Sequence, residues 1–99
     1  MTINKTAEGS KLTLTLMGRL DTMTAPRLEE VVRKELDGMT EVVMDFEKLD
    51  HLSSVGLRVI LAAKKIVKKQ GDMVILHVNE TIMEVFDVTG FSGILSIQG

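Results

Sequence analysis

A nearly continuous apolar stretch, residues 42–46 (VVMDF), lies between two longer segments whose apolar residues recur at helical spacing. A single acid in an otherwise apolar run is typical of a central strand that is covered on both faces. The helical positions are Leu28, Val31, Val32 and Leu36 before the strand, and Val59, Ile60, Ala63, Ile66 and Val67 after it. Because a strand-like segment also precedes the first helix, the pattern predicts parallel strands joined by helices and therefore an α/β fold.

The strand before the first helix is predicted by alternation. Residues 11–17 alternate strictly, with Leu12, Leu14 and Leu16 on one face, which indicates a half-exposed strand. Residues 7–10 (AEGS) favour a turn, so the preceding segment is expected to form a hairpin with this strand. Further strands are predicted at residues 2–6, 73–78 and 94–97. The expected order is β-β-α-β-α-β-α-β, a mixed sheet of about five strands with helices packed on it, in a single domain over residues 1–99.

Capping residues mark where the helices are expected to begin and end. Thr24 is a candidate N-cap of the first helix, and Pro26 suits its first turn. The third helix has two candidate N-caps, Asn79 and Thr81, and Thr81 would form a capping box with Glu84. Glycines expected to end the three helices stand at Gly38, Gly71 and Gly90.

The composition excludes several classes of function. A formal net charge of -2 and a pI near 5.6 lack the basic footprint of a nucleic-acid-binding protein, so no nucleic-acid partner is expected. The absence of cysteine rules out disulfides and thiolate zinc sites. Because the chain has no signal peptide and its longest unbroken apolar run is residues 59–63, we expect a cytoplasmic protein without a membrane segment. Lysines near the end of the second helix complement its dipole, which we prefer to a membrane or nucleic-acid patch; they are Lys64, Lys65, Lys68 and Lys69.

Polar residues gather in two predicted strand-to-helix loops. The first loop contains Arg19, Asp21 and Thr22, and the second contains Asp50, His51, Ser53 and Ser54. Loops that follow neighbouring parallel strands meet at one edge of the sheet, where open α/β sheets place their ligands. We therefore expect these polar groups to share one surface.

Ser53 and Ser54 stand at the expected N-terminus of the second helix. Free N–H groups and the positive end of the helix dipole accommodate an anion such as phosphate there, although a serine at this position is also a common N-cap. A hydrolase with His51 as base is disfavoured, because the base is too close in sequence to align across the turn and the G-x-S-x-G elbow is absent. We expect no enzymatic activity, no catalytic residue and no cofactor. His77 is expected to be a surface residue rather than a metal ligand, because two histidines without a nearby acidic cluster make no metal site.

Four segments in order resemble the STAS domain family. They are Gly18-Arg19-Leu20-Asp21, residues 42–46, residues 52–61 (LSSVGLRVIL) and residues 85–91 (VFDVTGF). The resemblance extends over essentially the whole chain. It implies a free-standing anti-sigma factor antagonist in a partner-switching circuit.

The resemblance also implies the partners and the site of regulation. Such an antagonist binds an anti-sigma factor that is also a serine protein kinase, which frees a sigma factor to direct transcription. Phosphorylation by the kinase breaks the complex, and a metal-dependent serine phosphatase restores it. In the family the phosphoacceptor lies two residues before the motif glycine; with Gly56 as that glycine, the acceptor is Ser54. Many members have aspartate immediately before the acceptor, where this chain has Ser53, so Ser53 is the second candidate.

A partner surface around the phosphoacceptor follows from this resemblance. Its expected residues are Asp21, Thr22, Leu52, Ser53, Ser54, Val55, Gly56, Leu57 and Arg58. We expect Leu52, Val55, Leu57 and Arg58 to form a mostly apolar patch that a phosphate on Ser54 would prevent the partner from covering. Asp21 and Thr22 either orient the serine or contact the partner, or else serve only as turn and capping residues. A monomer that forms heterocomplexes is expected, and the alternative is a constitutive interaction or scaffold subunit that phosphorylation does not regulate.

Overall fold

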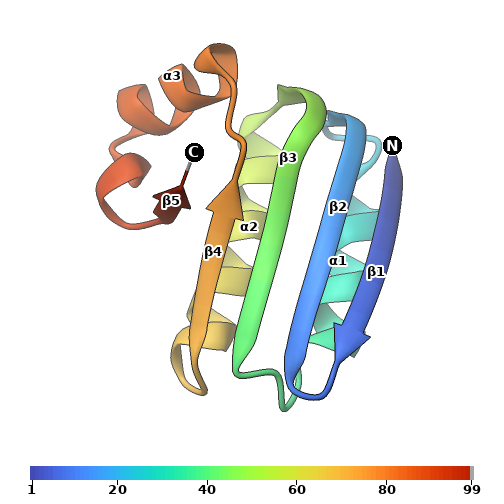
Figure 1. The fold of residues 1–99 in the computed structure, drawn as a ribbon. Coiled ribbons are helices and arrows are strands. Elements are labelled where there is room, and N and C mark those ends of the chain that lie inside the picture. Colours follow the sequence, from blue (N-terminus) through green and yellow to red (C-terminus); the bar gives the residue numbers. More distant parts are fainter. Residues whose placement is uncertain (99) are drawn as a thin grey trace.

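The computed structural model describes residues 1–98, and its first two strands form the antiparallel hairpin that the sequence predicts (Figure 1). β1 (Thr2–Glu8) pairs with β2 (Lys11–Leu20), and Gly9 adopts a left-handed φ of +60° in the turn between them. Both strands are longer than the predicted ranges. The antiparallel ladder continues as far as the pair Glu8 and Lys11, and β2 remains paired with the next strand to its last residue, Leu20.

The rest of the chain alternates helices and strands. The elements are α1 (Ala25–Glu35), β3 (Glu41–Leu52), α2 (Ser54–Lys68), β4 (Asp72–Leu76), α3 (Glu80–Thr89), the 3₁₀ turn η1 (Phe91–Gly93) and β5 (Ser96–Gln98). The sheet has five strands in the order β1-β2-β3-β4-β5, with parallel pairing from β2 to β5 and antiparallel pairing of β1. The predicted α/β class, the mixed sheet and the order of the elements are confirmed.

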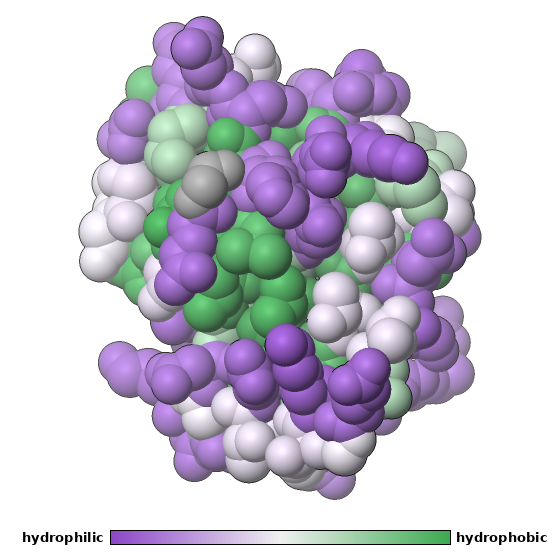
Figure 2. Space-filling model, viewed as in Figure 1, coloured by the Kyte–Doolittle hydropathy of each residue, from purple (hydrophilic) through white to green (hydrophobic). Residues whose placement is uncertain are grey.

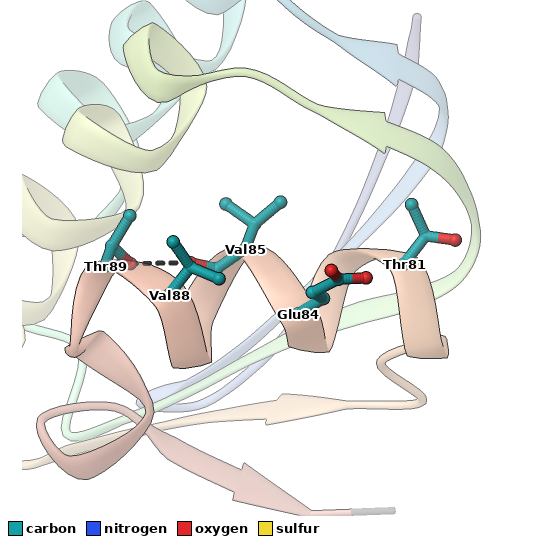
Figure 3. A pocket seen from close by; sticks show the side chains of 5 residues that line it. All are labelled: Thr81, Glu84, Val85, Val88 and Thr89. Carbon is teal, nitrogen blue, oxygen red and sulfur yellow. Dashed lines mark hydrogen bonds between the residues drawn. The ribbon is translucent and has the colours of Figure 1, made fainter.

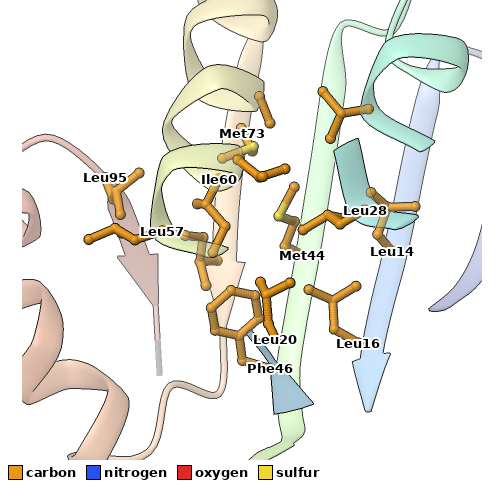
Figure 4. Close-up of a cluster of buried hydrophobic side chains, with 14 of the residues drawn as sticks. Leu14, Leu16, Leu20, Leu28, Met44, Phe46, Leu57, Ile60, Met73 and Leu95 are labelled. Atoms are coloured by element: carbon orange, nitrogen blue, oxygen red, sulfur yellow. The ribbon is translucent and has the colours of Figure 1, made fainter. Parts of the chain in front are cut away.

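The hydrophobic core lies between the sheet and two helices. Figure 1 shows α1 and α2 on the same face of the sheet. The apolar stripes of these helices meet alternate residues of β2, β3 and β4, and the fully buried side chains include Leu14, Leu16, Leu28, Met44, Phe46, Ile60 and Met73 (Figure 4). Full burial stabilises the fold by about 1.5–3 kcal/mol for each large apolar side chain.

The other face of the sheet is only partly covered. Val43 and Asp45 of β3 are half-buried, whereas Val42 and Met44 on the helix-covered face are fully buried. The expectation that this central strand is covered on both faces is therefore wrong. Figure 2 shows apolar atoms near the middle of this face with hydrophilic residues around them. Val43 pairs in register with Val74 of β4, which accounts for an apolar residue at this position without a helix above it.

β3 is longer than predicted and includes residues that were expected in a loop. Thr15 pairs with Asp45 but Met17 pairs with Lys48, and a second irregularity follows before the pair Arg19 and His51. At each irregularity β3 has one residue more than β2, as in a β-bulge. Asp50 and His51 therefore belong to the strand, and a single residue, Ser53, connects β3 to α2.

The last third of the chain decides one open alternative and corrects two details of the prediction. Asn79, not Thr81, caps α3, because its Oδ1 accepts the N–H of Ile82 at 2.8 Å. β4 ends at Leu76 rather than at residue 78, since His77 has a φ of +58° and leaves the extended conformation. β5 starts at Ser96 because η1 and the helical backbone of Ile94 precede it. Gly90 ends α3 in the left-handed conformation, as predicted.

Candidate functional site

The two loops that were expected to share a surface meet at the end of β2. The N–H of Ser53, which links β3 to α2, donates to the carbonyl of Leu20 at 2.9 Å. Leu20 is the last residue of β2 and is followed directly by the loop of Asp21 and Thr22. The N-terminus of α2 and the β2–α1 loop therefore lie at one edge of the sheet, and the expectation is confirmed.

Ser53 and Ser54 have different roles in the helix start. Ser53 is the N-cap of α2, with an extended backbone (φ -89°, ψ 169°), and its Oγ accepts the N–H of Gly56 at 3.1 Å. Ser54 is the first residue of the helix and is exposed. The cap is thus the serine that precedes the candidate phosphoacceptor, and Ser54 is an exposed residue at the positive end of the helix dipole.

Gly56 allows the first turn of α2 to approach the end of β2 closely. A Cβ atom at this position would lie 2.6 Å from Cγ of Leu20 and 3.0 Å from its carbonyl oxygen. Contacts this short require the helix or the strand to shift. Gly56 therefore fixes the position of the exposed Ser54 by permitting close packing one half-turn further along the helix.

The expected apolar patch around Ser54 is corrected by the burial of its members. Leu52 and Leu57 are 4% and 3% exposed and belong to the core, and Gly56 is buried as well. Leu52 is the last residue of β3 and Leu57 lies in the first turns of α2, and both side chains are part of the core between the sheet and the helices. Ser54 and Arg58 are exposed and Val55 is half-buried, so these three residues form the accessible surface of the helix start.

Asp21 organises the β2–α1 loop. Its Oδ1 accepts the N–H groups of Met23 and Thr24 at 3.0 and 3.1 Å, and the Thr24 hydroxyl donates to the carbonyl of Arg19 at 2.8 Å. These hydrogen bonds, led by that from the Thr24 N–H and helped by the nearby Arg19 guanidinium, lower the pKa of the Asp21 carboxyl. The turn role proposed for Asp21 is thus present, and Thr22 is exposed next to it.

Met23 is a surface residue that the sequence analysis missed. Its side chain is 85% exposed at the tip of the β2–α1 loop, immediately after Asp21 and Thr22. A single exposed apolar side chain is common on protein surfaces, so its position beside Thr22, and not its exposure alone, links it to the candidate site. The available signal was an apolar residue inside an otherwise polar loop, outside the periodicity of either flanking element.

Among residues 1–98, no hydrogen bond joins Asp50, His51 and Ser54, the residues of the hydrolase interpretation. Asp50 and His51 lie in the bulged end of β3, where His51 pairs with Arg19 across the strands. The Ser53 hydroxyl is occupied by the amide of Gly56, so it is held as a helix cap.

A second cluster of polar residues lies elsewhere on the sheet. Nδ1 of His77 is 2.9 Å from Oδ1 of Asp45 and 3.8 Å from Oε2 of Glu47. The hydrogen bond to Asp45 raises the pKa of His77 against a smaller opposing effect of burial. The pKa of Asp45 is lowered, since hydrogen bonds from the Glu47 N–H and from His77 together outweigh its burial. The premise that no acidic cluster accompanies His77 is therefore wrong: Asp45 and Glu47 are distant in sequence but adjacent in the fold.

A groove lies along one side of α3. It has a volume of about 350 Å³ and is lined by Thr81, Glu84, Val85, Val88 and Thr89 (Figure 3). Val88 is 80% exposed, and the Thr89 hydroxyl donates to the carbonyl of Val85 at 2.7 Å. None of these residues belongs to the two loops around Leu20.

None of the helices within residues 1–98 combines the length and the apolar character that a membrane crossing needs.

Comparison with known proteins places this chain in a family. The sequence profile of the STAS domain matches residues 2–98. The protein BtrV of Bordetella bronchiseptica, whose name provisionally calls it an anti-sigma factor antagonist, is 36% identical over 84 residues, which cover 83% of this chain and 72% of BtrV.

Solved structures share the fold. An anti-sigma factor antagonist from Mycobacterium paratuberculosis superimposes with a TM-score of 0.86 at 21% identity, over 97% of this chain and 83% of that one. SpoIIAA, an anti-sigma factor antagonist, matches in its unphosphorylated form with a TM-score of 0.73 at 15% identity, over 99% and 88% of the two chains. The phosphorylated form of SpoIIAA from Bacillus matches with a TM-score of 0.69 at 16% identity, over 99% and 92%.

Proposed function

Because this chain belongs to the STAS domain family, we propose that it acts as an anti-sigma factor antagonist whose binding is switched by phosphorylation of Ser54. In this function the unmodified protein binds an anti-sigma factor that is also a serine protein kinase, and the bound sigma factor is released. The kinase modifies Ser54 and the complex separates. A serine phosphatase removes the phosphate and restores binding.

The observation that carries the proposal is the position of Ser54. It is an exposed residue in the first turn of α2, whereas Ser53 is half-buried and its Oγ accepts the Gly56 N–H. A kinase reaches an exposed hydroxyl without opening the fold, but modification of Ser53 would break the helix cap. The geometry therefore favours Ser54 over Ser53. SpoIIAA, which shares the fold, has solved structures in unphosphorylated and phosphorylated forms.

A phosphate on Ser54 would change the surface without unfolding the protein. It adds about -1.5 to -2 charges at the positive end of the α2 dipole, where a negative charge stabilises a helix. The same phosphate must be desolvated when a partner covers the helix start. A loss of about 3–4 kcal/mol in binding free energy lowers the affinity a few hundredfold, which is sufficient for a switch.

The surface that we assign to the partner is narrower than the set expected from the sequence. It consists of Ser54, Val55 and Arg58 on α2, together with Thr22 and the exposed Met23 on the β2–α1 loop. Leu52, Gly56 and Leu57 are buried beneath this surface, and the hydrogen bonds of Asp21 fix the β2–α1 loop. In this proposal the chain is a cytoplasmic monomer that forms heterocomplexes, and it is a binding protein rather than an enzyme.

Four immobilised forms of the protein test the switch: the wild type, Ser54→Ala, Ser54→Asp and the control Ser92→Asp. Ser92 is an exposed serine of η1, so its replacement adds the same charge away from the helix start. Each form is exposed to lysate of the native host, washed, and incubated with ATP. The retained partner is identified, and the phosphorylated residue of each bait is mapped by mass spectrometry.

We expect the wild type, Ser54→Ala and Ser92→Asp to retain one kinase-like partner that Ser54→Asp fails to retain. The wild type should acquire a phosphate on Ser54, and Ser54→Ala should acquire none. Equal retention by all four forms with no phosphate on any bait would contradict regulation by phosphorylation and favour a constitutive interaction module. Phosphate on Ser53 would show that Ser53, and not Ser54, is the phosphoacceptor.

A further inference from the structure

Three ligand atoms of the kinds that bind transition metals converge on the partly covered face of the sheet. One ligand atom each from His77, Asp45 and Glu47 lies within 4.8 Å of the other two, and Nδ1 of His77 is 2.9 Å from Oδ1 of Asp45 and 3.8 Å from Oε2 of Glu47. The side chains of His77 and Glu47 are 51% and 67% exposed, so an ion in water reaches them freely. Asp45 is less accessible, at 24%, and forms the inner wall of the cluster.

The backbone of His77 brings its imidazole to this face. Leu76 pairs with Asp45 across β4 and β3, so both side chains lie on the partly covered face. An extended residue after Leu76 would point to the opposite face, toward the helices. The φ of +58° at His77 interrupts this alternation, and the ring returns to 2.9 Å from Asp45. The N–H of His77 donates to the carbonyl of Gln98 at 3.2 Å, which fixes the turn against β5.

We propose that Asp45, Glu47 and His77 form a binding site for a divalent transition metal ion, with Zn²⁺ as the best-matched ion. Imidazole nitrogen and carboxylate oxygen are ordinary zinc ligands at about 2.0–2.2 Å. In a tetrahedral site with bonds of this length, ligand atoms are separated by about 3.3 Å. The observed separations from Nδ1, 2.9 and 3.8 Å, lie on either side of this value.

The charges of the site match a divalent cation. Two carboxylates and a neutral imidazole sum to two negative charges, which one Zn²⁺ neutralises. Nδ1 of His77 is hydrogen-bonded to Asp45, and metal binding requires this nitrogen to be unprotonated so that it offers its lone pair to the ion. Three protein ligands leave the fourth position of the ion to water. Mg²⁺ and Ca²⁺, which prefer oxygen ligands, are expected to bind far more weakly.

The test titrates untagged, metal-free protein with Zn²⁺ by isothermal calorimetry and follows the imidazole nitrogens by NMR. The variants His77→Asn, Asp45→Asn and Glu47→Gln each remove one ligand. Asparagine tolerates the left-handed backbone of position 77, and at position 45 it retains an acceptor for the Glu47 N–H. The matched control is His51→Gln, because His51 is the other histidine of the chain.

We expect the wild type to bind one Zn²⁺ per chain and the NMR resonance of His77 Nδ1 to shift on binding. The affinity for Zn²⁺ should fall about tenfold or more in each ligand variant. The His51→Gln control should bind as the wild type does. Absence of binding by the wild type, or binding that survives His77→Asn, would overturn the site. Binding abolished by His51→Gln would also overturn it, since the ion would then sit at the other histidine. None of these residues belongs to the Ser54 surface, so this result and that of the phosphorylation experiment are independent.

Discussion

Asp21 shows how one carboxylate shapes the candidate partner surface without being part of its contact area. Its Oδ1 accepts the N–H groups of Met23 and Thr24, and these hydrogen bonds shape the loop that leads from β2 into α1. The same interactions present Thr22 and Met23 to solvent. At the scale of single residues, a turn residue therefore positions the groups that we assign to partner binding.

The charge of Asp21 should make the stability of this loop depend on pH. Because the pKa of Asp21 is lowered in the folded protein, its carboxylate stabilises the fold above its unfolded pKa of about 3.9, and this stabilisation is lost as the pH falls through the folded pKa. We expect Asp21→Asn, which keeps an acceptor but no charge, to lower the Tm near neutral pH. Asp21→Ala should lower it further.

Thermal unfolding by circular dichroism across the acid range checks this prediction. The difference in Tm between the wild type and Asp21→Asn should shrink as the solution is acidified, because the wild-type carboxyl becomes neutral. A difference that stays constant across the range would show that the charge of Asp21 does not contribute.

Residue roles were predictable where sequence position alone determines them. The first helical turn after a buried strand made Ser53 and Ser54 candidates for a cap and an accessible hydroxyl, and the structure assigns the cap to Ser53. The burial of Leu52 and Leu57 was not predicted. Which side chains point into the core at a strand-to-helix junction depends on the length of the connection, and the single-residue connection at Ser53 was not predicted. The contact of His77 with Asp45 depends on a left-handed backbone and on strand pairing over 32 positions, which no local pattern encodes.

At the scale of elements, α3 is attached to the sheet through its N-cap. Asn79 Oδ1 accepts the N–H of Ile82, and its Nδ2 donates to the carbonyl of Leu49 at 3.0 Å. One side chain thus caps the helix and joins it to β3. The sequence offered Thr81 as an equal candidate, because a capping box is a pattern of neighbouring residues. The hydrogen bond from Asn79 to the carbonyl of Leu49 joins residues that are distant in sequence, so it could not be predicted in this way.

We expect Asn79→Ala to destabilise the protein by about 1–2 kcal/mol, since it removes a helix cap and leaves the carbonyl of Leu49 without its donor. Asn79→Asp should recover part of this loss, because aspartate caps a helix but cannot donate to Leu49. Thr81→Ala is the matched control and should change the stability by less than about 0.5 kcal/mol. Urea denaturation measures all three. A Thr81→Ala variant as unstable as Asn79→Ala would mean that the capping box operates after all.

The limits of the strands show where element prediction fails. Alternation located β2 to within a few residues, because it buries one face along its length, whereas β1 is mostly exposed and was located by the turn that joins it to β2. The end of β3 was assigned to a loop, since Asp50 and His51 are polar and the two bulges interrupt the alternation. A bulge is defined by how a strand pairs with its neighbour, so the sequence of one strand alone does not reveal it.

At the scale of the whole molecule, the C-terminal elements are less firmly attached than the rest. β5 has three residues and pairs only with β4, and Figure 1 shows α3 beyond the edge of the layer formed by α1 and α2. Phe86 and Ile82 are the buried residues of α3. The ring of Phe86 lies 6.5 Å from that of Phe46 on β3, centroid to centroid, and so connects this part to the main core.

We therefore expect residues 77–98 to open as a unit with a lower free energy than the sheet from β1 to β4, and native-state hydrogen exchange measures this directly. Phe86→Ala, which removes about 3–5 kcal/mol of core packing, should lower amide protection mainly in α3 and β5. The control Leu14→Ala removes a side chain from the centre of β2 and should lower protection throughout the sheet and in the C-terminal elements alike. If Phe86→Ala reduced protection in β2 as much as in α3, the chain would unfold as one cooperative body. The Ser54 surface is built on β2, β3 and α2. A C-terminal unit that opens separately would therefore leave partner binding intact while the amide hydrogens of α3 and β5 exchange with solvent.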